Sequence, residues 1–168
     1  ISFAGPGKRD VELAAAAAAG ATINLESEGE LARLVALGVP ARVAVRINPP
    51  FDIRGSGMKM GGGARAFGVD ADRVPAMLDA IAASHLDFDG FHVFAGSQNL
   101  SVEAIAAAQA QTIDLVASFG VRPRRVNLGG GFGLPYFPDD KPLDVEAVGA
   151  ALGEKLARRT DTLADTAF

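Results

Sequence analysis

Three consecutive glycines, Gly129, Gly130 and Gly131, directly follow a short apolar run in the stretch RRVNLGGGFGLPY. Glycine has no Cβ, so the backbone of such a loop can approach another group closely, and its N–H groups can converge on an anion such as a phosphate. Glycine runs also serve as plain flexible turns. The residues alone therefore leave open both an anion-binding loop and a structural turn.

A second polar segment, Ser97 and Gln98 after Gly96, follows another apolar run in the stretch GFHVFAGSQN. A hydroxyl and a free N–H at a strand end can bind a phosphate oxygen. Alternation with a period of two residues puts His92 and Phe94 on one face of the preceding strand. The sequence around His92 shows no acidic partner, so a hydrogen-bonded core histidine and a catalytic histidine both remain open. For Phe94, core packing is the default interpretation.

Arg46 ends the run VAVR, residues 43–46, which is otherwise apolar. A buried guanidinium needs an anionic or polar partner, because an unpaired charge is costly to bury. Either a structural ion pair with a neighbouring strand residue such as Glu26 or a bound anion would meet that need. The glycine-rich segment that follows, residues 48–68, is long for a strand–helix connection, and it fits a substrate-covering loop and a surface excursion equally.

The elements that must position these residues follow a repeated strand–helix pattern. Hydrophobic periodicity predicts strands at about residues 1–4, 21–25, 41–47, 88–95 and 124–128, and helices at about 10–19, 27–37, 70–84, 101–120 and 144–156. Asp10 is the expected N-cap of the first helix, and Ser27 with Glu30 has the spacing of a capping box at the second. Such a succession of strand–helix units argues for a parallel sheet with right-handed crossovers.

Two architectures have this order of elements: an open doubly wound sheet and part of a (β/α)8 barrel. A complete barrel needs eight units and about 250 residues. The unusual segments 5–8, 26–27, 46–48, 96–98 and 129–131 all follow predicted strands, and in a barrel such loops share one rim. In a doubly wound sheet they would divide between two faces. We therefore predict an α/β fold, a partial (β/α)8 TIM barrel of about five strand–helix units.

Composition narrows the class of protein. The chain has 168 residues, 49% of them hydrophobic, which is enough for a compact core. A net charge of −4 and scattered arginines argue against nucleic acid as a partner, and no apolar run is long enough to span a membrane. With no cysteine and two histidines, a structural zinc site is not expected. No signal peptide precedes Ile1, so we expect a cytoplasmic protein. Because Ile1 is not methionine, we also expect a piece of a longer chain.

Six blocks of the sequence together resemble the barrel domain of the pyridoxal-phosphate-dependent decarboxylases, the group that includes the diaminopimelate, ornithine and arginine enzymes. In order, the blocks are FAGPGK, NLESEGEL, RINP, MGGGARAFGVD, GFHVFAGSQN and NLGGGFGLPY. Within the family they are most similar to the branch found with exosortase and exopolysaccharide systems. The resemblance implies an alanine-racemase-like barrel, a second β-rich domain and a homodimer with sites at the subunit interface. It assigns residues 1–158 to the cofactor-binding barrel domain and leaves 159–168 as a tail without a pattern.

The same resemblance implies that the cofactor is pyridoxal 5'-phosphate and that the substrate is an amino acid, free or carrier-linked. Gly129, Gly130 and Gly131 would hold the cofactor phosphate with their backbone amides, and Ser97 would contribute from the neighbouring strand end.

Around the pyridine ring, the resemblance implies a polar network that includes Arg46, with Glu26 and Ser27 close by on the rim. His92 matches a position that is often histidine in the diaminopimelate branch. Phe94 occupies the position where the family usually stacks a histidine on the ring, and a phenyl face can stack there but cannot carry charge or donate a hydrogen bond.

Two catalytic groups of the family have no counterpart in the sequence. The Schiff-base lysine would lie on a strand before residue 1, and the acidic partner of the pyridine nitrogen on a strand after residue 168. Lys8, Lys59, Lys141 and Lys155 do not match the lysine position, and the second domain that supplies further residues is missing. Since decarboxylation uses the protonated ring as an electron sink, we expect an internal fragment that is inactive alone. We also expect the open edges of a partial barrel to make it poorly soluble in isolation.

Two other functions stay open. One is a non-catalytic relative that binds pyridoxal phosphate or regulates a decarboxylase. The other is a racemase on the same barrel, which fits less well because NLGGGFG and GSQN resemble the decarboxylase group.

Overall fold

The structure is a computed structural model that describes residues 1–51, 58–59, 66–157 and 163–168. Its strands are β1 (Ser2–Phe3), β2 (Thr22–Leu25), β3 (Arg42–Asn48), β4 (Met58–Lys59), β5 (Val69–Asp70), β6 (Asp87–Val93), β7 (Gly96–Ser97) and β8 (Arg125–Asn127). Its helices are α1 (Asp10–Ala18), α2 (Glu28–Ala36), the 3₁₀ turn η1 (Ala71–Arg73), α3 (Val74–Ala82), α4 (Val102–Ser118) and α5 (Val145–Ala157).

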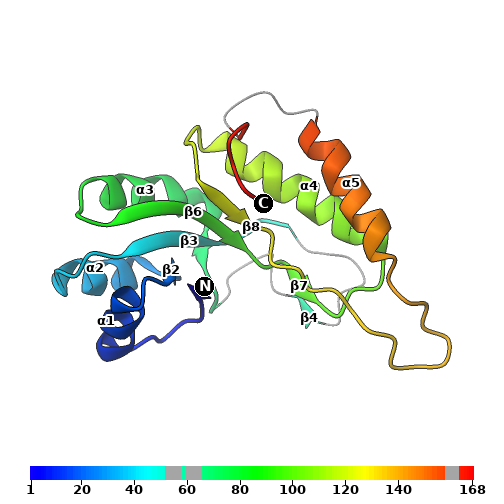
Figure 1. Ribbon diagram of the computed structural model, residues 1–168, viewed down its shortest axis with the longest axis horizontal. Helices are drawn as coiled ribbons and strands as arrows, with labels where there is room; N and C mark the ends of the chain where they lie inside the picture. Colours follow the sequence, from blue (N-terminus) through cyan, green and yellow to red (C-terminus); the bar gives the residue numbers. More distant parts are fainter. Residues whose placement is uncertain (52–57, 60–65, 158–162) are drawn as a thin grey trace.

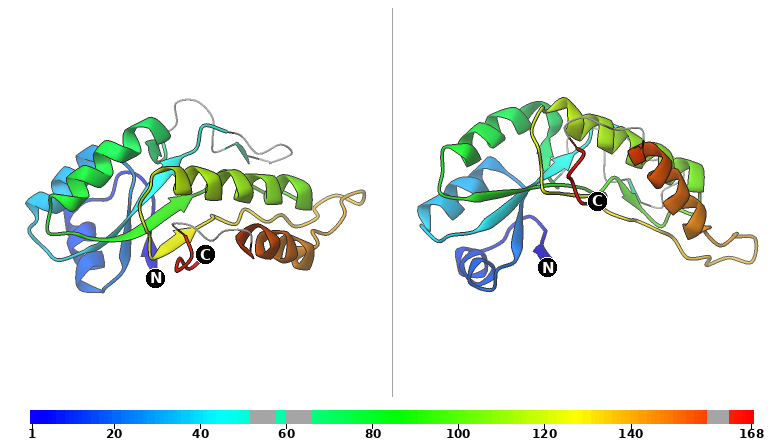
Figure 2. Two further views of the ribbon diagram at one scale, coloured as in Figure 1. Left: turned by 90° about the horizontal axis from the view of Figure 1, so that it is seen from above. Right: turned by 45° about the horizontal axis from the view of Figure 1, so that its top comes forward.

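The main sheet is parallel and its strand order follows the chain. Strands β1, β2, β3, β6 and β8 pair in that order, and β5 extends the sheet beside β3. The sheet is curled, and helices α1 to α4 follow its outer side, with α5 packed on α4 (Figures 1 and 2). Because the strand order never reverses, the switch point of a doubly wound sheet is missing among the described strands. The predicted partial barrel is confirmed.

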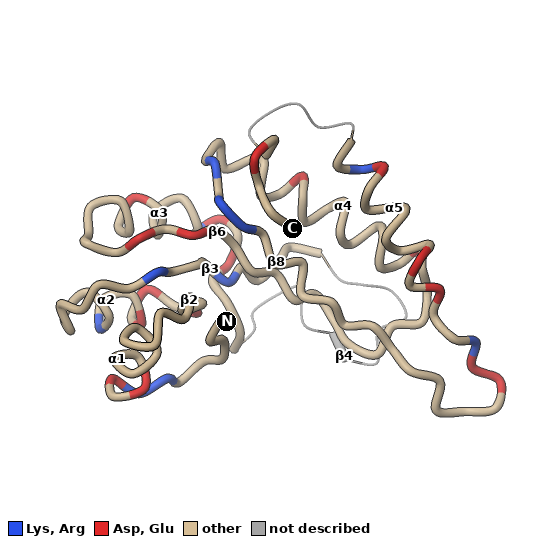
Figure 3. The backbone as a smooth tube through the Cα atoms, in the orientation of Figure 1, with Lys and Arg blue, Asp and Glu red and all other residues tan. Residues whose placement is uncertain are grey.

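Alternation along the strands separates the two faces of the sheet. One set of side chains is apolar and fully buried in a core shared with the helices: Ile23, Leu25, Val43, Val45, Ile47, Val93 and Val126. The alternate positions are polar or small, and several of them line a hollow on the inner side: Thr22, Asn24, Ala44 and Asn127. Period-two patterning therefore builds an apolar outer layer and a polar inner face. Charged residues of both signs are interspersed along the described chain (Figure 3).

The first helix begins differently from the prediction. Its N-cap is Arg9, not Asp10, and the Glu12 carboxylate accepts the Arg9 N–H at 2.8 Å. Asp10 is the first helical residue and accepts a 2.7 Å hydrogen bond from Arg33 of α2. The predicted cap was wrong because Glu12 already closes the first turn, which leaves Asp10 available to a neighbouring helix.

The second helix confirms half of the predicted capping box. The Ser27 hydroxyl accepts the Glu30 N–H at 3.2 Å, as expected of the N-cap. The Glu30 carboxylate does not return to Ser27, since it accepts the Glu26 N–H at 2.9 Å and also binds Lys8. The buried ammonium group of Lys8 requires a charged partner, so the Glu30 carboxylate binds Lys8 and does not close the capping box.

The two-residue strands β4, β5 and β7 were not predicted, because they are too short to show a period. β4 pairs antiparallel with β7, which joins part of the 48–68 segment to the strand that carries Ser97. The rest of that segment lies partly outside the described residues, so its predicted role is untested. At the chain end, Leu163 is 4% exposed, the Val126 N–H donates to the Ala167 carbonyl at 2.8 Å, and Ala167 forms a parallel bridge with Arg125. The last residues thus lie where a next parallel strand would pair with β8.

Candidate cofactor site

The predicted site residues all lie at or just beyond the carboxyl ends of parallel strands. The register pairs Arg46 of β3 with His92 of β6, and His92 with Asn127 of β8. Strand β6 ends at Val93, so Phe94 lies just past it. Ser97 belongs to β7, and the glycine loop follows β8 directly. Sheet order therefore places these residues, from Arg46 to Gly131, at the same end of the sheet.

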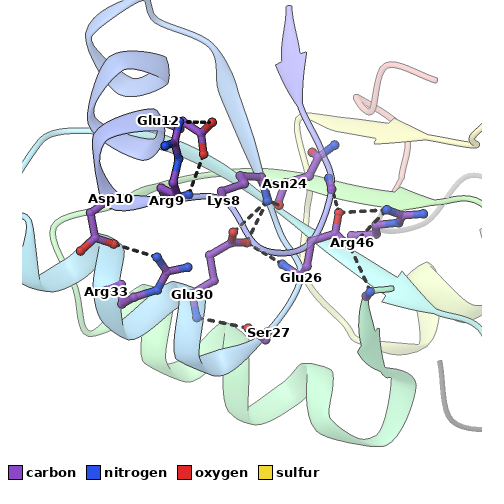
Figure 4. Close-up of polar contacts among 12 residues, drawn as sticks. Lys8, Arg9, Asp10, Glu12, Asn24, Glu26, Ser27, Glu30, Arg33 and Arg46 are labelled. Carbon is purple, nitrogen blue, oxygen red and sulfur yellow. Dashed lines mark hydrogen bonds and ion pairs between the residues drawn. The ribbon is translucent and has the colours of Figure 1, made fainter. Parts of the chain in front are cut away.

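Arg46 forms an ion pair with Glu26, which was one of the two partners that its sequence allowed (Figure 4). Its Nη1 atom donates to both carboxylate oxygens, at 2.9 and 3.1 Å. The same carboxylate accepts the Gly5 N–H at 2.5 Å and the Gly68 N–H at 3.1 Å. Glu26 is 5% exposed and Arg46 7% exposed, and the Phe67 ring centroid lies 5.0 Å from the guanidinium carbon. This carboxylate, at the end of β2, joins Arg46 within β3 to Gly5 after β1 and Gly68 before β5.

A second buried ion pair lies beside the first (Figure 4). Lys8 Nζ donates to the two Glu30 carboxylate oxygens, at 2.9 and 3.0 Å, and to the Asn24 carbonyl at 2.9 Å. An ammonium group has three N–H donors, so these three acceptors match its capacity. Lys8 is 4% exposed, and its ammonium group is fully engaged in these contacts.

His92 has an amide partner that is distant in sequence. Asn24 Nδ2 lies 3.2 Å from His92 Nδ1, across the intervening strand β3. The residue of β3 in register with Asn24 is Ala44, whose small side chain leaves room for this contact. Burial, together with the cationic Arg46, lowers the pKa of His92 to about 4, while the Glu26 carboxylate opposes the shift. His92 is therefore neutral at neutral pH, and a neutral imidazole can serve as a hydrogen-bonding group but not as a cation.

The glycine loop has positive φ at all three positions: +84° at Gly129, +78° at Gly130 and +79° at Gly131. A Cβ on Gly129 would overlap the Val93 carbonyl oxygen and lie 2.9 Å from the Phe94 ring, and a Cβ on Gly131 would overlap the Gly96 carbonyl oxygen. A Cβ on Gly130 would meet no atom within 4 Å. The chain's own backbone thus excludes side chains at two of the glycines, and only the middle one faces open space.

The backbone N–H groups of this loop fit an anion. The Gly129 N–H donates to Asn127 Oδ1 at 2.8 Å, which fixes the start of the loop. No acceptor in the described part of the chain binds the N–H groups of Gly130 or Gly131. Consecutive free N–H groups in a left-handed turn form an anion-binding concavity, so the loop fits a phosphate group.

A hollow of about 270 Å³ opens on the inner face of the sheet. It is lined by Ile1, Ser2, Thr22, Asn24, Ala44, Asp89, Phe91, Arg125 and Asn127. None of Gly129, Gly130, Gly131, Ser97 or Phe94 belongs to this lining. The hollow therefore occupies the barrel interior, and the glycine loop forms a separate feature at the strand ends.

Three features of the site were missed in the sequence. The buried ion pair between Lys8 and Glu30 was not predicted, because a loop lysine and a helix-cap glutamate are ordinarily exposed. Asn24 could have been noticed, since the alternation in TINLE puts it on the same face as Glu26. The side-chain contacts of Gln98 with the glycine loop, described below, gave no signal either.

A curled, partial parallel barrel with a glycine loop at its strand ends defines part of a (β/α)-barrel protein. Residues 1–166 match the family model described as pyridoxal-dependent decarboxylase, pyridoxal binding domain. The chain belongs to this family, and the cofactor of the family is pyridoxal 5'-phosphate.

Similar proteins point to the same group. The chain is 37% identical over 172 residues to the L-glutamyl-[BtrI acyl-carrier protein] decarboxylase of Niallia circulans, covering 96% of the chain and 40% of that protein. It is 32% identical over 177 residues to the diaminopimelate decarboxylase of Pseudomonas aeruginosa, covering 97% of the chain and 41% of that protein. The crystal structure of diaminopimelate decarboxylase from Helicobacter pylori complexed with L-lysine matches with a TM-score of 0.84 and 26% identity, covering 99% of the chain and 44% of that structure. The chain thus spans about 40% of the length of these relatives.

No helix in the described ranges is both long and apolar enough to cross a membrane.

Proposed function

We propose that this chain forms the phosphate-binding part of a pyridoxal-phosphate-dependent enzyme that decarboxylates an amino acid. The observation that carries the proposal is the glycine loop, in which Gly130 faces open space and the N–H groups of Gly130 and Gly131 have no acceptor in the described structure. When bound, the cofactor supplies an electron sink for the electron pair left by departing carbon dioxide. The complete protein acts as a homodimer, as the resemblance implies.

In this proposal, the glycine loop binds the cofactor phosphate and Phe94 contacts the cofactor ring. The amides of Gly130 and Gly131 bind the phosphate, with Ser97 next to them. The Phe94 ring, which lies against Gly129, offers an apolar face for stacking. Stacking on a phenyl ring adds no charge, so the electrostatic contribution comes from other groups.

Arg46 and His92 contribute to the polar side of the site. The Glu26 carboxylate holds the guanidinium of Arg46 in one orientation and balances its charge. Neutral His92 provides a hydrogen-bonding group that does not repel a cationic neighbour. The chain spans about 40% of the length of its relatives. The family resemblance assigns the cofactor-binding lysine and the acidic partner of the pyridine nitrogen to strands that these 168 residues do not match.

The substrate is an amino acid, free or linked to a carrier. Support for a carrier-linked substrate comes from the Niallia circulans relative, whose name specifies an L-glutamyl group on an acyl-carrier protein. Support for a free diamino acid comes from the diaminopimelate decarboxylases among the relatives.

Carbon dioxide release by the gene product, purified at its encoded length and loaded with pyridoxal phosphate, tests the proposal. The substrates are meso-diaminopimelate, ornithine, arginine, and glutamate attached to an acyl-carrier protein. We expect turnover of one of them and loss of turnover after removal of the cofactor. Tight cofactor binding without release of carbon dioxide from any substrate would favour the alternative, a non-catalytic or regulatory relative.

A further inference from the structure

The chain takes an unusual backbone conformation at Gln98, directly after Ser97. Among the described residues, Gln98 is the single residue other than glycine with positive φ, at +54°. Side chains with a Cβ disfavour this left-handed region, and such a conformation persists only where surrounding contacts compensate for it.

The compensating contacts reach the glycine loop. Gln98 Nε2 donates to the Leu134 carbonyl at 2.5 Å, and the Leu134 N–H donates to Gln98 Oε1 at 3.2 Å. The side-chain amide therefore uses its donor and its acceptor on one backbone residue, as a neighbouring strand would. Gln98 and Leu134 are 36 positions apart in sequence, so the contact depends on the fold.

The adjacent backbone extends this connection. The Asn99 N–H donates to the Gly131 carbonyl at 3.1 Å, and the Gly133 N–H donates to the Asn99 carbonyl at 2.9 Å. With the two bonds of Gln98, four hydrogen bonds join residues 98–99 to residues 131–134. The start of the loop is held separately by Asn127.

We infer that Gln98 is a positioning residue that holds the end of the glycine loop in register with Ser97, so that both sides of the phosphate site keep a fixed separation. The inference rests on the proposed function for the identity of the ligand. The geometry favours it because Gln98 is bonded to the loop through its side chain and to Ser97 through the peptide chain. Movement of the loop end would therefore change the direction of the free Gly131 N–H relative to Ser97.

The test compares binding of pyridoxal 5'-phosphate with binding of pyridoxal, which lacks the phosphate, to the purified gene product and its variants. Q98A removes the amide and keeps the backbone strain, whereas Q98G removes both. Q111A is the matched control, because Gln111 is an exposed glutamine of α4 that contacts its own helix. We expect Q98A and Q98G to raise the Kd for pyridoxal 5'-phosphate by about tenfold, because they lose the net free energy of roughly one to two hydrogen bonds. We expect the Kd for pyridoxal to stay unchanged.

A second readout, hydrogen exchange of the peptide that contains Leu134, does not depend on the cofactor. We expect faster exchange there in Q98A and Q98G than in the wild type and in Q111A. Unchanged exchange, or an unchanged Kd for pyridoxal 5'-phosphate in both Gln98 variants, would overturn the inference. A wild-type protein that fails to bind pyridoxal 5'-phosphate would instead refute the proposed cofactor site.

Discussion

The Glu26 carboxylate is expected to be the most sensitive single group at the strand ends. The substitution E26Q keeps the shape of the side chain and removes its charge. The wild-type carboxylate accepts four hydrogen bonds, two from Arg46 and one each from the Gly5 and Gly68 N–H groups. A carboxamide has one oxygen, and its NH₂ group would face another donor. Arg46, 7% exposed, would remain as a buried cation without a charge partner.

Breaking one side of a buried ion pair costs about 3–5 kcal/mol. With a urea m value of about 2 kcal/mol/M, this loss lowers the midpoint of unfolding by about 1.5–2.5 M. The measurement is urea denaturation of the gene product followed by circular dichroism. E28Q is the matched control, since Glu28 pairs with Arg73 on the surface, where both side chains are about half exposed, and we expect its midpoint to stay near that of the wild type.

A double-mutant cycle separates the ion pair from other effects. R46M removes the cation and keeps an apolar side chain against Phe67. We expect the double variant E26Q/R46M to be more stable than the sum of the two single losses predicts, because no uncompensated charge is left. Equal midpoints for E26Q and the wild type, or strictly additive losses in the cycle, would refute the assignment of Glu26 and Arg46 as a coupled buried pair.

Further predictions concern the glycine loop, the histidine and the aromatic ring. G131A should lower the unfolding midpoint more than G130A, because a Cβ at residue 131 would overlap the Gly96 carbonyl, whereas at Gly130 only the positive φ opposes a side chain. G130A should instead weaken binding of pyridoxal 5'-phosphate. Equal unfolding midpoints for the two variants would contradict the packing argument. The pKa of His92, about 4 against an ordinary 6.5, corresponds to about 3 kcal/mol of stability that is present above pH 6.5 and lost as the pH falls toward 4. H92Q should flatten this part of the pH–stability curve, and an unchanged curve would show that His92 does not titrate as described. F94A should raise the Kd for pyridoxal 5'-phosphate by about tenfold, which corresponds to the upper end of the free energy of one aromatic contact. F94Y should retain affinity, and equal Kd values for F94A and F94Y would argue against stacking at this position.

Much of the fold could be predicted from the sequence, because period-two and helical patterns act locally. The predicted strand at residues 41–47 corresponds to β3, and the predicted helices at 101–120 and 144–156 correspond to α4 and α5 within a few residues. The short strands β4, β5 and β7 could not be predicted, since each consists of two residues and exists only through its pairing partner.

The candidate site was predictable in part. The glycine loop, Ser97 and Arg46 were all singled out by residue type at a strand end. The partner of Arg46 stayed undecided until the sheet order put β2 next to β3, which brings Glu26 within 2.9 Å. The contact between Asn24 and His92 required the order β2, β3, β6 and a small residue in the middle strand, and neither condition can be read from one segment.

The glycine run at residues 129–131 shows which properties follow from the sequence and which follow from the tertiary structure. The sequence by itself determined that no Cβ is present at residues 129–131 and that the chain can turn there with positive φ, because these are properties of the residue type. Only the tertiary structure decided why each glycine is needed. Gly129 and Gly131 pack against the backbone that follows β6, and Gly130 is left facing outward. The reason is physical: steric exclusion depends on which distant backbone lies within a few ångströms, and that is set by strand register.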